Sequence, residues 1–134
     1  MTQVLGGTKM DYLHVEIESV FDSIKERLGG IEVYANSFDN DILASINGAF
    51  ATLHQLGIDD REGKPIVVTD TDQKWSDFLD MTRYGWLKDY VYFKVRLVFD
   101  PPANSSVLSS MQSQLDEMTW RIEVERDMEI NGYV

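Results

Sequence analysis

The chain has 134 residues, of which 43% are hydrophobic and 26% charged, a composition typical of one soluble globular domain. It carries 23 acidic and 12 basic side chains, and the resulting net charge of −11 argues against tight binding to the phosphate backbone of nucleic acids. It contains no cysteine, which excludes disulfides, thiolate metal sites and thiol catalysis. The sequence shows neither a signal-peptide pattern nor an apolar run long enough to cross a bilayer, so we expect a cytoplasmic protein without membrane contact.

The first predicted helix follows a polar, glycine-containing stretch, residues 1–10, which we expect to be flexible. From Asp11 onward, apolar residues recur at spacings of three and four, which predicts a helix with one buried stripe. Asp11 is placed to cap its start, and Gly29-Gly30 to end it. The stripe consists of Leu13, Ile17, Val20, Phe21, Ile24 and Leu28.

A second helix is predicted after Ser37, which offers an N-cap, with Asp39 and Asp41 in its first turn. Gly57 and Ile58 have the spacing of a Schellman ending, in which a left-handed glycine stops the helix and an apolar residue follows it. The apolar side chains between these signals recur with the helical period: Ile42, Leu43, Ile46, Ala49, Phe50 and Leu53.

Residues 59–72 predict a long polar loop, interrupted by a short apolar piece at residues 66–68 that is suited to an extended conformation. Thr71 or Asp72 is placed to cap a short helix that carries Trp75, Phe78 and Leu79. Residues 83–85 then predict a turn before the next apolar segment.

The segment 86–99 satisfies two patterns at once. Strict alternation of apolar residues and many β-branched and aromatic side chains indicate a strand. A helical face is also present, formed by Leu87, Val91, Val95 and Val98. The pattern alone slightly favours a strand, but a lone strand would leave its backbone groups unpaired, and the neighbouring segments are helical.

A hard stop follows at Asp100, Pro101 and Pro102, because a proline fixes its φ and restricts the residue before it. Residues 105–126 then predict a long helix capped by Asn104 or Ser105. Its apolar residues form a narrow seam that needs a partner, either the 86–99 segment or another chain: Leu108, Met111, Leu115, Met118 and Ile122. We treat residues 11–126 as one domain and 127–134 as a tail that orders on assembly.

No residue pattern indicates catalysis, a metal or a cofactor. His14 and His54 each lack a nearby second ligand, and the acidic pairs around residues 39–41, 59–60 and 70–72 do not continue as a calcium loop. Helix caps and solvated turns explain these carboxylates better than a metal hydrolase does. The basic and aromatic residues of 90–96 would share a face only in a strand, and the charge of −11 disfavours base stacking there.

Three segments together resemble the head–tail connector (adaptor) proteins of tailed phages. The second predicted helix reads SFDNDILASINGAFATLHQLGI, which is similar to the paired aspartates and ILxxINGAFxTLxQLG of that family. The middle of the chain reads WSDFL. The last third reads KDYVYFKVRLVFDPP followed by a helix that ends in EMTWRIEVE, which resembles the family's YVYxKVxLxFDPP and its terminal WR. The likeness covers most of residues 37–126.

This resemblance implies a mainly α-helical domain of about four to five helices, and it turns the expectation for 86–99 from strand to helix. It implies a structural virion protein without enzyme activity or cofactors. Such a protein assembles as a ring, dodecameric in relatives, below the portal protein, extends the DNA channel and provides a docking surface for a head-completion or tail protein. We expect DNA to pass through without tight binding, and the protein to occupy the virion after assembly in the host cytoplasm.

The residues expected to contact the portal or a neighbouring copy lie in the 86–99 segment, at the proline corner and along the last helix: Tyr92, Phe93, Asp100, Pro101, Pro102, Leu108, Met111, Leu115, Met118, Trp120, Arg121 and Ile122. An apolar surface edged by tryptophan and arginine is typical of binding hot spots. The alternative hypothesis is a cytosolic helical adaptor or regulator that binds one partner helix through the same seam. Which residues face the channel is left open by the sequence.

Overall fold

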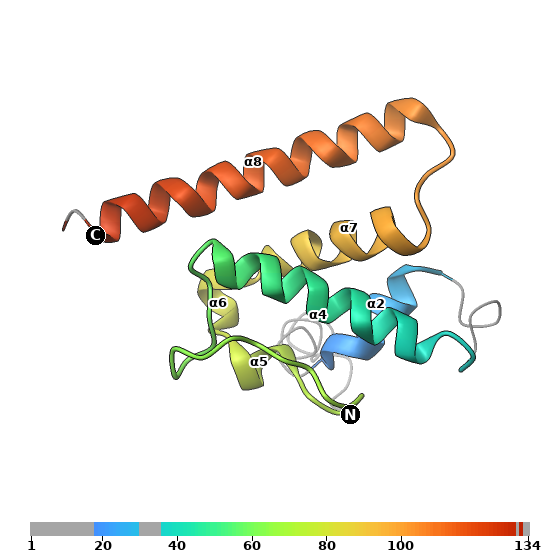
Figure 1. Ribbon diagram of the computed structural model, residues 1–134, viewed down its shortest axis with the longest axis horizontal. Helices are drawn as coiled ribbons and strands as arrows, with labels where there is room; N and C mark the ends of the chain where they lie inside the picture. The colour runs from blue at the N-terminus through green and yellow to red at the C-terminus, as the bar shows by residue number, and fades with distance from the viewer. Residues whose placement is uncertain (1–17, 30–35, 131, 133–134) are drawn as a thin grey trace, which may run out of the picture.

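The computed structural model describes residues 18–29, 36–130 and 132, and within these residues it contains six helices and no strand. In chain order they are α2 (Val20–Arg27), α4 (Asp39–Gln55), α5 (Trp75–Phe78), α6 (Met81–Tyr84), α7 (Leu87–Phe99) and α8 (Ser105–Ile130). The mainly helical class with a long C-terminal helix is confirmed. In Figure 1, α8 lies along one side of a body formed by the other helices, and a short connection at one edge joins it to α7.

Helix α7 is the centre of the core. It packs most extensively on α4 and also contacts α2 and α8. Leu87, Val91 and Val95 are fully buried, and Tyr90 and Tyr92 are almost so. The segment 86–99 is therefore a helix, and the strand favoured by its alternation is wrong. Its apolar residues surround the helix axis because three other helices cover it, and this wide burial blurs the helical period.

Helix α4 has the buried face that its spacing predicts, with Leu43 at the edge and Ile42, Ile46, Ala49, Phe50 and Leu53 in the core. The Schellman ending is confirmed. The Ile58 N–H donates to the Leu53 carbonyl at 2.8 Å, the Gly57 N–H donates to the His54 carbonyl at 2.9 Å, and Gly57 has a φ of 97°. The predicted Ser37 cap is wrong, because Phe38 is the N-cap and no side chain caps the helix start.

Helix α2 begins at Val20, so the long helix predicted from Asp11 is wrong at its middle. Ser19 is extended, and its Oγ accepts from the Asp22 N–H at 2.9 Å as an N-cap. The same stretch pairs with the chain before α5, where the Val20 N–H donates to the Gln73 carbonyl at 2.9 Å. The predicted parts of that helix before residue 18, His14 and the N-terminal stretch 1–10 lie outside the described residues.

Side-chain hydrogen bonds hold the loop between α4 and α5 against the core. Val68 is 1% exposed, and the Asn47 side chain bonds both of its backbone groups: Oδ1 accepts from the N–H at 2.8 Å, and Nδ2 donates to the carbonyl at 2.9 Å. Trp75 is fully buried, and its Nε1 donates to Ser23 Oγ at 2.8 Å. These two polar contacts place α5 and the loop against α4 and α2.

The short helices differ from the sequence prediction in their starts. Helix α5 begins at Trp75 after Lys74, so the cap predicted at Thr71 or Asp72 is wrong. The Asp77 carboxylate accepts from the Lys74 N–H at 2.8 Å instead. The turn predicted at 83–85 is displaced, because Arg83 belongs to α6 and the chain turns at 85–86.

Helix α8 starts as predicted and ends later. Asn104 caps it, with Oδ1 accepting from the Ser106 N–H at 2.8 Å and from the Val107 N–H at 3.2 Å. The helix continues to Ile130, four residues past the predicted end at Arg126. Residues 127–130 are therefore helical in the single chain.

Candidate functional site

The proline corner sets the position of α8. Asp100 ends α7, and its N–H donates to the Arg96 carbonyl at 2.8 Å. Pro101 is exposed and Pro102 half-buried. The Phe99 ring just before the corner meets the Phe38 ring edge to face, with centroids 5.7 Å apart, and so fastens the end of α7 to the start of α4. The corner thus turns the chain back along α7 at a fixed place.

The seam of α8 is covered by its own chain. Of its five side chains, Leu108 is half-buried and the other four are buried: Met111, Leu115, Met118 and Ile122. Helix α7 is the partner, the first of the two partners that the sequence left open. Tyr90 of α7 takes part in this contact, and burial raises the pKa of its phenol. In this conformation α7 of the same chain covers the four buried side chains, and their expected contact with the portal or a neighbouring copy stays a prediction.

Trp120 and Arg121 lie on the accessible side of α8. Trp120 is 63% exposed. The Arg121 guanidinium lies 5.6 Å from the centre of the Trp86 ring and donates to Glu117 Oε2 at 3.3 Å. These two residues keep the exposure that a contact residue needs.

Tyr92 and Phe93 have different surroundings. Tyr92 is buried beneath the Arg27 guanidinium, which lies 3.9 Å from its ring centre, and its hydroxyl donates to the Arg27 carbonyl at 3.3 Å. It therefore fastens α2 to α7, and its expected role as a contact residue stays a prediction. Phe93 is half-buried in an open groove of about 370 Å³ with Val107 and Met111 of α8. Phe93 is the more accessible of the two.

The last turns of α8 are held by polar contacts that the sequence did not indicate. Arg83 of α6 donates to Glu129 Oε2 at 2.9 Å and to Glu125 Oε1 at 3.2 Å, and these bonds raise the pKa of the guanidinium. Gly57 lies under the Arg126 side chain, since a Cβ at that position would come within 3.0 Å of Arg126 Cδ. The sequence shows that Glu125 and Glu129 share one face of the helix, but it does not indicate that Arg83 is their partner.

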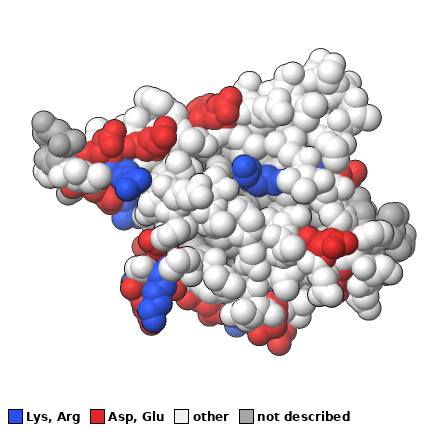
Figure 2. All heavy atoms as spheres, in the orientation of Figure 1, with Lys and Arg blue, Asp and Glu red and all other residues white. Residues whose placement is uncertain are grey.

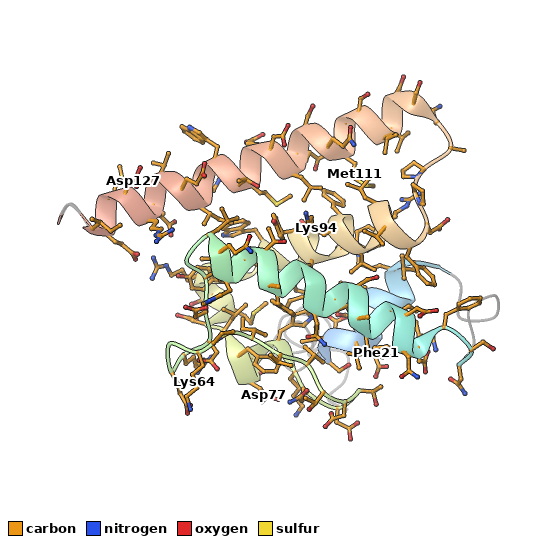
Figure 3. All side chains as sticks on the ribbon, in the orientation of Figure 1. Phe21, Lys64, Asp77, Lys94, Met111 and Asp127 are labelled. Carbon is orange, nitrogen blue, oxygen red and sulfur yellow. The ribbon has the colours of Figure 1, made fainter. Side chains whose placement is uncertain are left out.

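Charged side chains are unevenly spread. In Figure 2 the acidic groups of the viewed face lie along the middle and left end of α8, along the lower edge and at the right side, while much of the centre is uncharged. Figure 3 shows Lys94 of α7 in the space between α4 and α8. The viewed face therefore has a nearly neutral area between its charged edges.

The acidic loops act as turns within the described residues. Asp60 Oδ1 accepts from the Lys64 N–H at 2.9 Å, and Asp70 Oδ1 accepts from the Asp72 N–H at 2.8 Å. His54 Nδ1 lies 2.6 Å from Asp59 Oδ1 at the exposed end of α4. No three potential ligand side chains gather into a metal site in the described part of the chain. No helix in that part is long and apolar enough to cross a membrane.

Comparison with known proteins gives one match. The model of the family described as phage connector protein matches residues 20–129. This range runs from the start of α2 to the last turn of α8, and so includes the proline corner and the exposed Trp120. Neither the curated proteins nor the solved structures contain a significant match. The chain therefore belongs to the phage connector protein family, and has the structural role in the head–tail connection that this family implies.

Proposed function

We propose that this protein assembles as a closed ring below the portal protein of the phage head, extends the DNA channel and presents a docking surface to a head-completion or tail protein. The match over residues 20–129 carries the proposal. The exposed Trp120 supports it, because an indole on the outside of a soluble helix is typical of a protein contact. A ring requires a contact between two different surfaces of one chain, repeated until the rotation closes.

The net charge suits a channel that DNA crosses. At −11 per chain, a ring repels the phosphate backbone, so exiting DNA slides without adhering. The residues that face the bore are then acidic or neutral. An assembled ring with a bore lined mainly by lysine and arginine contradicts this part of the proposal.

The direct experiment is electron microscopy of the purified protein mixed with its portal protein. We expect an added ring of density, coaxial with the portal, and the protein in purified virions. In cells that produce phage it is made in the cytoplasm and joins the head before the tail. A protein that stays monomeric with the portal and is absent from virions is not a ring-forming connector.

The alternative of a cytosolic adaptor is not favoured. It requires the seam of α8 to be free for a partner helix, whereas α7 of the same chain fills it. A carboxylate-dependent hydrolase has no supporting side-chain cluster among the described residues. A structural role in the virion needs neither a cofactor nor a catalytic group.

A further inference from the structure

Two long stretches of this acidic protein carry no charge. Helix α4 has no charged side chain from Ile42 to Leu53, and α8 has none from Ser105 to Leu115. The area between them is correspondingly almost free of acidic groups in Figure 2. Because every copy has a net charge of −11, two copies approach each other most closely where at least one of them lacks carboxylates.

A groove lies in this neutral area. It has a volume of about 400 Å³ and is lined by small side chains of α4 and by Lys94 and Val98 of α7. Val98 is 75% exposed, so the groove has an apolar wall that the chain leaves uncovered. A Cβ at Gly48 would meet no atom within 4 Å, so packing inside the chain does not require this glycine. Glycine weakens a helix interior, and here it keeps the groove wide.

Lys94 gives the groove one positive charge. It is half-buried, and among residues 18–29, 36–130 and 132 no hydrogen bond or ion pair occupies its ammonium group. Its place between α4 and α8 is visible in Figure 3. A partly desolvated ammonium without a carboxylate gains from an acidic partner. The groove is thus suited to an apolar group with acids beside it.

The same chain presents such a group on another surface. Trp120 is 63% exposed and lies on the side of α8 opposite the buried seam. Asp116 and Glu117 stand one turn before it, and Glu123 stands one turn after it. Residues three and four apart share a helix face, so Asp116 and Glu123 frame the indole, whereas Glu117 already pairs with Arg121. The indole complements the apolar wall of the groove, and the carboxylates beside it complement the charge of Lys94.

We propose that the groove between α4 and α7 receives Trp120 of a neighbouring copy, and that Lys94 pairs with a carboxylate beside that indole. The inference rests on the proposed ring and specifies which two surfaces meet in it. Groove and indole belong to different faces of one chain, so each copy offers one of each to different neighbours. Such a head-to-tail contact repeats around a ring.

The first test breaks each surface separately. Trp120→Ala removes the inserted group, and Gly48→Leu fills the groove. Each should weaken self-association at least about 30-fold, the effect of losing one hot-spot residue, in sedimentation velocity over a range of concentrations. Gln55→Leu is the matched control on the exposed end of α4, and it should associate like the wild type. Lys94→Glu should weaken association, whereas Lys64→Glu, with the same change in net charge, should not.

Mixing Trp120→Ala with Gly48→Leu, each of which lacks one of the two surfaces, provides the decisive readout. Trp120→Ala retains a groove and Gly48→Leu retains an indole, so their mixture should form a dimer and nothing larger in native mass spectrometry. Equal assembly of both single variants and the wild type overturns the proposed contact while leaving the ring intact. A mixture that forms full rings also overturns it.

A cross-link covers the case in which the isolated protein is a monomer. The chain has no native cysteine, so Val98→Cys and Asp116→Cys can be combined in one chain and oxidised in assembled particles. A ladder of multimers of this chain supports the contact. A ring without the ladder refutes this interface alone, and a cross-link to another virion protein assigns the groove to that protein. No ring in any preparation refutes the proposed function as well.

Discussion

Asn47 connects the long loop after α4 to the core, and we expect its removal to destabilise the fold measurably. Its two bonds to the Val68 backbone are 2.8 and 2.9 Å long, and Val68 is shielded from solvent. A hydrogen bond contributes about 0.5–1.5 kcal/mol net, and more is lost when the remaining partner stays buried. Asn47→Ala should therefore lower the free energy of unfolding by about 1–3 kcal/mol.

Urea unfolding followed by circular dichroism measures this loss, and a thermal melt gives a second estimate. For a domain of this size, a loss of 2 kcal/mol lowers Tm by about 5–10 °C. Asn40→Ala is the matched control, because Asn40 is an exposed asparagine in the first turn of the same helix. If the two variants unfold within about 0.5 kcal/mol of each other, the Asn47 bonds do not hold the loop.

Three further predictions concern α8 and the turn before α6. Leu115→Ala should cost about 2–4 kcal/mol in urea unfolding because its side chain is buried, and Leu108→Ala less than half of that because it is half-buried. Arg83→Gln should cost only about 0.2–1 kcal/mol, since the ion pairs are exposed, yet it should speed amide hydrogen exchange in the last turns of α8, as should high salt. The hydrogen bond from the Thr82 hydroxyl lowers the pKa of the Asp80 carboxyl. The stabilisation that this bond provides is therefore present above the ordinary aspartate pKa, and it is lost as pH falls through the lowered value. An NMR titration should show that midpoint below about 3.9 and rising in Thr82→Ala, and an unchanged midpoint contradicts the assignment.

The elements that the sequence predicted best have one buried face. Helix α4 and the seam of α8 each pack on one side, so their apolar residues keep a clean period. The Schellman ending was predictable because its signal is local, with Gly57 and Ile58 at fixed positions after the helix. Local signals and single-sided burial are the features that a sequence displays directly.

The failures have physical causes. Segment 86–99 resembled a strand because α7 is covered on several sides, which hides its period. The start of α2 was missed because apolar spacing continues across Ser19, and spacing alone does not register a residue that leaves the helix. The groove was missed because its two walls, one in α4 and one formed by Lys94 and Val98 of α7, are distant in sequence, and because the α4 side chains are small. Its local signal was Gly48, a glycine in the interior of α4.

The last buried residue of α8 is Ile122, and eight helical residues follow it. They extend about 12 Å beyond that anchor at the rise of an α-helix. Polar contacts from Arg83, and the side chain of Arg126 over Gly57, hold this overhang. A tilt of about 10° would move its tip by roughly 2 Å without opening the core. In the proposed ring, the end of α8 is therefore the part of the helix that can shift toward a partner's surface while Ile122 and the residues before it stay packed on the core.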